Sequence, residues 1–160
     1  MSDEKSLIEH LIASSKTLAT AESCTGGLIG KLLTDVSGSS AAYLGGIISY
    51  SNEVKHRVLG VPQELLDIYG AVSAQVAKAM AEGARRVIGS DLAVSVTGIA
   101  GPKSDSTNKP VGLVYIGVTD GTTTEVREYR FSGDRETVRS TTAQTALRNV
   151  ALFLERQEKS

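Results

Sequence analysis

The feature that most constrains this fold is the alternation of helical and strand patterns along the chain. Apolar residues three to four positions apart predict amphipathic helices, and short apolar runs bounded by glycine or polar residues predict strands. The order is helix, strand, helix, strand, a run of helices, strand, a turn-rich loop, two strands and a final helix. This order favours an α/β layered domain with a mixed, mostly parallel sheet flanked by helices.

Turn and capping residues give these elements their expected boundaries. We expect helices over 6–14, 28–36, 52–59, 62–70, 73–88 and 134–157, and strands over 17–22, 43–50, 91–97, 111–118 and 123–131. Asn52, Ser73 and Asp134 are the expected N-caps, because their side chains can accept from free N–H groups. Asp120-Gly121 predicts a hairpin between the last two strands, before the long final helix. The strand over 43–50 reads as buried, and 98–110 as an exposed loop.

Length and charge narrow the functional classes. A chain of 160 residues predicts one domain over 1–160 with a substantial core. Seventeen Lys and Arg against 18 Asp and Glu leave no basic excess of the kind that phosphate neutralisation requires. Only 4% of residues are aromatic, which disfavours a base-stacking platform. We therefore expect no nucleic-acid partner.

Compartment and metal use follow from a few absences in the sequence. No run reaches the roughly 18 apolar residues that span a bilayer. The start, MSDEKSLIEH, lacks a signal-peptide layout, so we expect a soluble, cytoplasmic protein with no membrane partner. A single cysteine excludes an internal disulfide. The sequence has only two histidines and no cluster of residues at metal-ligand spacing, so we expect no metal and no cofactor.

The segment AESCTGG lies between an expected strand and an expected helix. Free N–H groups at a helix start can stabilise an oxyanion, and glycines let a substrate approach the backbone. Ser23 is therefore a candidate nucleophile, with donors expected around Thr25, Gly26 and Gly27. The alternative is that Ser23 or Thr25 merely caps the helix and the glycines form a turn.

The segment SYSNEVKH offers a base. With Asn52 as cap, Lys55 falls in the first helical turn, where the helix dipole disfavours a cation. Partial burial would lower its proton affinity further, as a lysine base requires. The alternative is a solvated surface lysine. His56 is a rival base, but it lies about 100° around the helix, so only one of the two can face a given site. Cys24 reads as a packing residue; a nucleophilic Cys24–His56 pair is the less favoured chemistry.

Two further segments could contact a ligand. Thr97 and Gly98 end a strand in VSVTGIAGP, where donors can meet a substrate, although an ordinary turn explains the pattern equally well. Arg135 and Arg139 continue the apolar stripe of the final helix backwards. Buried arginines need an acidic partner, so these favour either a phosphate or a structural ion pair, for example with Glu22 or Asp134.

Taken together, six segments resemble the CinA C-terminal domain family over about residues 5–155. They are AESCTGG, GGIISYSNEVK, GAVS, VSVTGIAGP, KPVGLVYI and SGDRETVR, in that order. Enzymatic members of this family are nicotinamide mononucleotide deamidases. The resemblance implies a nucleotide substrate, a metal-free serine–lysine amidohydrolase mechanism, a place in pyridine nucleotide salvage and a homo-oligomer. Larger members carry an additional amino-terminal domain, so the resemblance is to the stand-alone form.

The resemblance also implies individual roles. Ser23 falls on the nucleophile, Lys55 on the base and Tyr50 beside it, while Thr97 and Arg135 fall on substrate-contacting positions. Which of Arg135 and Arg139 holds the phosphate stays open. The segment 103–108 departs most from the family pattern. Two alternatives remain: a catalytically silent nucleotide-binding module, or an amidase for another small amide.

Overall fold

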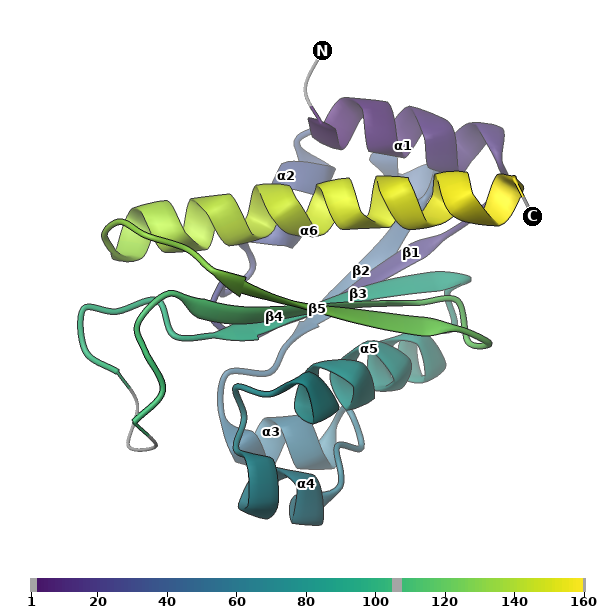
Figure 1. Ribbon diagram of the computed structural model, residues 1–160. Helices are drawn as coiled ribbons and strands as arrows, with labels where there is room; N and C mark the ends of the chain where they lie inside the picture. The colour runs from purple at the N-terminus through teal and green to yellow at the C-terminus, as the bar shows by residue number, and fades with distance from the viewer. Residues whose placement is uncertain (1–2, 105–107, 160) are drawn as a thin grey trace.

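The computed structural model describes residues 3–104 and 108–159, and its centre is one five-stranded sheet (Figure 1). The strands are β1 (Leu18–Glu22), β2 (Tyr43–Ile48), β3 (Leu92–Gly98), β4 (Leu113–Thr119) and β5 (Thr124–Arg130). Their order across the sheet is β2-β1-β3-β4-β5. Strands β2, β1 and β3 are parallel, whereas β4 runs antiparallel to both β3 and β5. Four of the five strands therefore share one direction, which confirms the mixed, mostly parallel sheet.

Helices cover both faces of the sheet, as Figure 1 shows. They are α1 (Asp3–Ala13), α2 (Leu28–Thr34), α3 (Asn52–Arg57), α4 (Gln63–Tyr69), α5 (Ala74–Ile88) and α6 (Arg135–Glu158), with a short 3-10 turn at Ser39–Ala41 that the sequence did not predict. Helices α1, α2 and α6 form one layer, and α3, α4 and α5 lie on the opposite side. None of the helices in the described part of the chain is long and apolar enough to cross a membrane.

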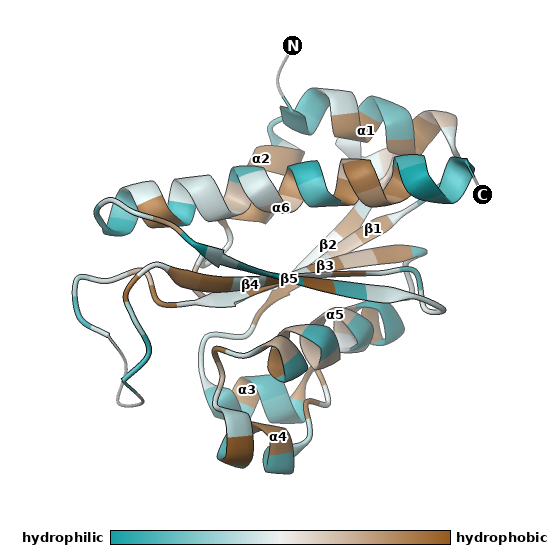
Figure 2. Cartoon of the chain, viewed as in Figure 1, coloured by the Kyte–Doolittle hydropathy of each residue, from teal (hydrophilic) through white to brown (hydrophobic). Residues whose placement is uncertain are grey.

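The hydrophobic core lies in two layers, one on each face of the sheet. Brown, apolar positions of α1 and α6 turn toward the sheet in Figure 2. On this side the largest cluster joins residues such as Leu7, Val94 and Phe153. On the other side Val76, Met80 and Ala84 of α5 pack against Ala19, Ala21 and Ala93. Small side chains on β1 and β3 thus let α5 approach the strands that carry the site described below.

Helix starts follow the expected chemistry with one correction. Ser73 and Asp134 cap α5 and α6, each accepting from a backbone N–H three residues on, as predicted. Asn52, however, does not cap α3. The hydroxyl of Ser51 accepts from the N–H of Val54, so Asn52 is the first helical residue. The helix therefore begins one residue earlier than the sequence suggested.

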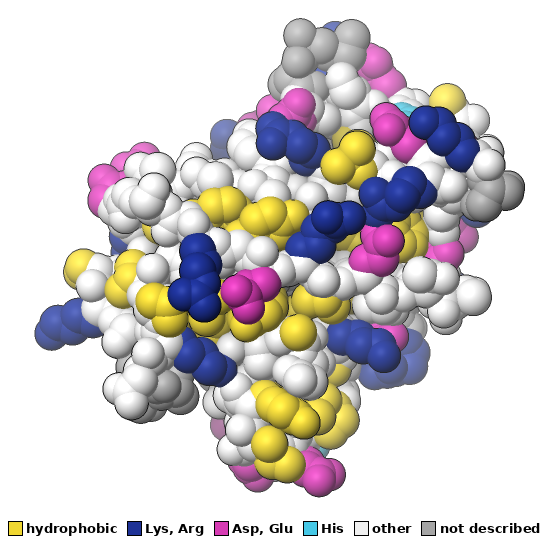
Figure 3. Space-filling model, viewed as in Figure 1, with side chains coloured by type: hydrophobic (Ala, Val, Ile, Leu, Met, Phe, Trp, Pro, Cys, Tyr) yellow, Lys and Arg dark blue, Asp and Glu magenta, His cyan; other side chains and the backbone are white. Residues whose placement is uncertain are grey.

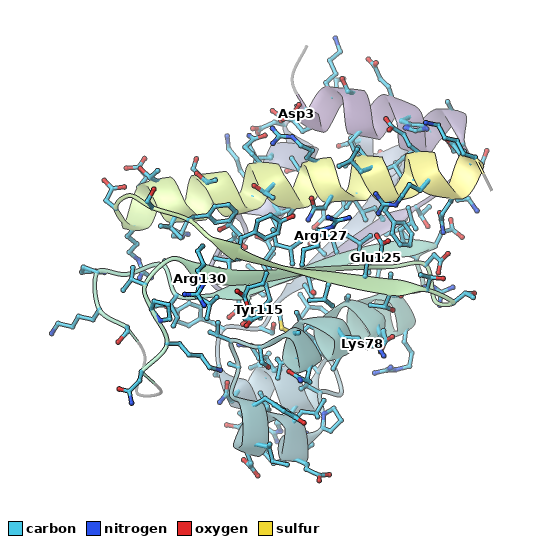
Figure 4. All side chains as sticks on the ribbon, in the orientation of Figure 1. Asp3, Lys78, Tyr115, Glu125, Arg127 and Arg130 are labelled. Carbon is cyan, nitrogen blue, oxygen red and sulfur yellow. The ribbon has the colours of Figure 1, made fainter. Side chains whose placement is uncertain are left out.

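Strand β2 is not buried, contrary to the sequence prediction. It lies at the edge of the sheet, where Leu44 is 47% and Ile48 is 54% exposed. An apolar run has the same sequence pattern in an edge strand as in a central strand of a sheet, because only the tertiary arrangement decides which strands lie beside it. The opposite edge, β5, carries Glu125, Arg127 and Arg130, labelled in Figure 4. On the face that Figure 3 shows, acidic and basic side chains intermingle rather than gather by sign.

Candidate active site

A cavity of about 260 Å³ opens where the parallel strands β1, β2 and β3 end. Carboxyl ends of parallel strands meet at one edge of a sheet, which is why ligands bind there in α/β folds. The segments that follow all three of these strands contribute to its wall. They supply Ser23 and Cys24, then Tyr50, Asn52 and Lys55, then Thr97–Gly101. Ile99, Ala100 and Gly101 are buried in this wall, so the loop over 98–110 is not exposed along its whole length.

Ser23 and Lys55 meet inside this cavity. The distance from Lys55 Nζ to Ser23 Oγ is 3.0 Å, although the two residues lie 32 positions apart in sequence. Ser23 follows β1, and Lys55 lies in the first turns of α3, which the chain enters directly after β2. Because β1 and β2 are parallel neighbours, their carboxyl ends bring the hydroxyl and the amine together. The predicted proximity of this pair is therefore present.

Lys55 is a buried lysine rather than a solvated one, with only 1% of its surface exposed. Burial disfavours the charged ammonium and lowers the pKa of Lys55 from 10.5 to about 8. Its Nζ also donates to the carbonyl oxygens of Ser49, at 2.7 Å, and Tyr50, at 3.2 Å. In the neutral amine these two carbonyls would take both N–H groups, which leaves the lone pair directed at Ser23.

The rival chemistry of Cys24 and His56 is excluded by their surroundings. His56 points away from the cavity, and its Nδ1 lies 2.8 Å from the carbonyl oxygen of Val61. Burial raises the pKa of the Cys24 thiol to about 11, so it stays protonated and weakly nucleophilic near neutral pH. Only Lys55 of the two candidate bases faces Ser23, as the helical spacing predicted.

Tyr50 and Arg135 lie together at the mouth of the cavity. Tyr50 is 65% exposed, and its hydroxyl lies 3.4 Å from an Nη atom of Arg135. Its link to Lys55 runs through its backbone carbonyl and not through the phenol. The other Nη of Arg135 donates to the carbonyl of Gly101 at 2.6 Å. These contacts hold the guanidinium beside the opening and leave further N–H donors for a ligand.

The expected oxyanion donors are not available at Gly26 and Gly27. The N–H of Gly26 donates to the carbonyl of Ser23, and that of Gly27 donates to the carboxylate of Glu22. Thr25 is buried, its hydroxyl donates to Glu22 at 2.7 Å, and it does not line the cavity. These contacts therefore do not support the assignment of Thr25, Gly26 and Gly27 to substrate. Sequence reasoning considered Glu22 only as a possible ion-pair partner of the arginines and missed its contacts with the start of α2. An acidic residue before a glycine turn that offers no capping side chain is a usable signal for such contacts.

Arg139 is also placed differently from the prediction. Its Nε donates to the carbonyl of Cys24 at 3.0 Å, and an Nη donates to that of Thr25 at 3.1 Å. It does not line the cavity, so it holds the Ser23 loop rather than a phosphate. Both arginines donate to carbonyl oxygens, and among the described residues neither forms the ion pair with Glu22 or Asp134 that was the alternative. Of the two, only Arg135 is placed to meet a ligand.

The far wall of the cavity is formed by Ala71 and Val72, between α4 and α5. The hydroxyl of Thr97 donates to the carbonyl of Ala71 at 2.9 Å, and its oxygen can still accept from a ligand. Lys109 Nζ donates to the carbonyls of Tyr69 and Val72, each at 2.6 Å. Gly98 also lines the cavity, where the closeness of β4 leaves no room for a Cβ.

The charges on the cavity wall are one-sided. Lys55, Lys103 and Arg135 line it, and no aspartate or glutamate lies among its described lining residues. This is unusual for a chain whose net charge is −1, and it favours an anionic ligand. Within residues 3–104 and 108–159, no group of three or more His, Cys, Asp or Glu side chains could hold a metal ion.

Comparison with known proteins identifies relatives over nearly the whole chain. The CinA C-terminal domain model matches residues 2–154. A "CinA-like protein" of Geobacter sulfurreducens is 60% identical over 131 residues, which are 82% of this chain and 32% of that protein. A "Putative competence-damage inducible protein" of Desulforudis audaxviator is 47% identical over 96% of this chain and 37% of its own length. The chain thus spans about a third of these curated relatives.

Solved structures agree in fold. A competence-damaged protein (CinA) superfamily protein of Klebsiella pneumoniae superposes with a TM-score of 0.94 at 31% identity, covering 96% of both chains. The competence/damage inducible protein of Agrobacterium tumefaciens gives a TM-score of 0.87 at 39% identity, covering 95% of this chain and 96% of that one. Family match, sequence identity and fold lead to one conclusion: this chain belongs to the CinA C-terminal domain family.

Proposed function

We propose that this protein is an amidohydrolase that converts nicotinamide mononucleotide to nicotinic acid mononucleotide and ammonia. The observation that carries the proposal is the contact between Ser23 Oγ and a buried Lys55 Nζ of lowered pKa. A serine is a weak nucleophile until a neighbouring base takes its proton, and a lysine is such a base only when it is neutral. The homo-oligomer and the role in nucleotide salvage that the resemblance implied remain part of this proposal.

The reaction would run in two stages. The Ser23 oxygen attacks the carboxamide carbon while Lys55 accepts its proton, and Lys55 then returns that proton to the departing nitrogen. Ammonia leaves, and the nicotinoyl group stays esterified to Ser23. Water then attacks the ester, with Lys55 as base again, and releases the carboxylic acid together with the free hydroxyl. No cofactor takes part in these steps as we propose them.

The cavity suits this substrate in shape and charge. Apolar surface for an aromatic ring next to Ser23 and Lys55 comes from Val72, Ile99 and Ala100. Arg135 and Lys103 supply positive charge for a phosphomonoester, and a guanidinium can bind phosphate through two parallel N–H groups. These groups also favour the mononucleotide over uncharged amides such as nicotinamide itself.

Ammonia release tests the proposal directly. The purified protein and a Ser23→Ala variant are incubated with nicotinamide mononucleotide, nicotinamide riboside and nicotinamide. We expect turnover on the mononucleotide by the wild type only, with much weaker activity on the other two amides. Binding of the mononucleotide without ammonia release would favour a silent binding module. Preference for an unphosphorylated amide would favour a different amidase, and equal activity of the Ser23→Ala variant would refute the mechanism.

A further inference from the structure

Glu22 is a buried carboxylate directly before the proposed nucleophile. It ends β1 and is only 2% exposed. Removing a carboxylate from water is unfavourable unless hydrogen bonds or a counter-charge compensate it. The oxygens of such a group, one residue from Ser23, must therefore be satisfied by nearby donors.

The carboxylate of Glu22 holds the start of α2. Its Oε1 accepts from the hydroxyl of Thr25 at 2.7 Å and from the N–H groups of Gly27 and Ile29 at 3.1 and 2.9 Å. Its Oε2 accepts from the N–H of Gly30 at 3.0 Å. Gly27 occupies the N-cap position, and it has no side chain with which to cap the helix. Glu22 thus does from the strand what a capping residue ordinarily does from within the loop.

The Ser23 loop is consequently held from two sides by groups of opposite polarity. Glu22 takes N–H and O–H donors of the loop and of α2, while Arg139 of α6 donates to the carbonyls of Cys24 and Thr25. The backbone of Glu22 also reaches the base. Its carbonyl accepts from the N–H of Ser49 at 2.7 Å, and the carbonyl of Ser49 in turn accepts from Lys55 Nζ.

We propose that Glu22 is a positioning residue for the reaction: its carboxylate fixes the loop that keeps Ser23 Oγ within hydrogen-bond distance of Lys55 Nζ. The inference rests on the proposed function, and it concerns geometry rather than charge transfer. In a Glu22→Gln variant one carboxylate oxygen becomes an NH₂ group, which must face a backbone N–H. Two donors then oppose each other, and the loop shifts. A displacement of about 1 Å can cost on the order of 10²-fold in rate.

The test compares Glu22→Gln and Glu22→Asp with the wild type and with Asp91→Asn. Asp91 is the matched control, because its carboxylate accepts from the N–H and hydroxyl of Thr17 at the opposite, amino end of β1. We measure kcat and KM for nicotinamide mononucleotide from pH 7 to 10, at a temperature where all variants are folded. In parallel we measure the rate at which a fluorophosphonate labels Ser23.

Glu22→Gln should lower kcat and the labelling rate by about 10- to 100-fold, with KM unchanged. The pH range over which kcat rises as Lys55 loses its proton, the acid limb of the pH profile, should not move. Glu22→Asp keeps both acceptor oxygens and should recover part of the loss, and Asp91→Asn should match the wild type. Unchanged kcat and labelling in Glu22→Gln overturn the proposal. A shifted acid limb also overturns it, because Glu22 would then act on Lys55 through its charge.

Two further arms keep the result decisive. If Glu22→Gln does not fold, Thr25→Val removes only the hydroxyl donated to Glu22, and Thr25→Ser retains it. The first should slow labelling and the second should not; equal rates overturn the proposal. If the wild type labels at Ser23 but releases no ammonia, the proposed substrate is wrong while Glu22 is still tested by labelling. A wild type that does not label overturns both.

Discussion

The pH dependence of turnover gives the most direct test of the role of Lys55. Only the neutral amine can accept the proton of Ser23, so kcat/KM should follow its titration. With a pKa of about 8, the neutral fraction is about 9% at pH 7 and about 90% at pH 9. The rate should therefore rise roughly tenfold over this range and then level off. A lysine with the ordinary pKa of 10.5 would be only about 0.03% neutral at pH 7, and the rate would still be climbing at pH 10.

The assay follows ammonia release at constant ionic strength between pH 7 and 10. A phosphomonoester has its second pKa near 6, so its own titration would change the substrate charge at lower pH. Lys55→Arg is the matched variant: it keeps a long cationic side chain that stays protonated in proteins. We expect it to lose nearly all activity at every pH. An acid limb near pH 10, a flat profile from pH 7 upward, or an active Lys55→Arg protein would refute the reasoning.

Two other substitutions probe stability and substrate charge. Lys55 has a lower pKa in the folded chain than in the unfolded one, so its burial penalty is full below pH 8 and disappears as pH rises to 10.5. Urea titrations give the unfolding free energies of Lys55→Met and of the wild type at each pH. The excess of the Lys55→Met value over the wild-type value should fall by about 3 kcal/mol between these pH values. A constant difference would contradict this. Arg135→Met should raise KM for nicotinamide mononucleotide by about 10- to 100-fold and barely affect nicotinamide riboside. Arg130→Met on β5 is its control, and equal losses on both substrates would argue against a phosphate contact.

Much of the fold was predictable because local patterns and tertiary packing agree. Ser73 and Asp134 cap helices in any surroundings that leave their side chains free to bend back to the backbone. The site was predictable for a related reason. Polar and glycine residues that follow parallel strands lie at one edge of the sheet. The proximity of Ser23, Lys55 and Thr97 could therefore be predicted from the sequence alone.

The sequence could not predict which hydrogen-bond partner each polar group takes or which strands become neighbours. Arg135 and Arg139 lie one helical turn apart on the same face, yet only the first reaches the cavity, because the loop after β1 packs against the second. The N–H of Gly27 looked free for an oxyanion because nothing in a linear pattern shows that the side chain of Glu22 folds forward onto it. The edge position of β2 likewise depends on which strand lies beside it.

The segment after β3 leaves the sheet and returns to β4 across a narrow base. Ile99 and Leu113 are joined by a backbone hydrogen bond of 3.0 Å, and the N–H of Gly112 donates to the carbonyl of Ile99 at 2.7 Å. Lys109 fastens the returning arm to the end of α4. These hydrogen bonds join the two ends of the segment to each other and to α4. Replacements or insertions near residue 103 therefore need not disturb Ser23 and Lys55. Evolution and engineering alike can thus alter what enters the cavity while the contact between Ser23 and Lys55 is kept.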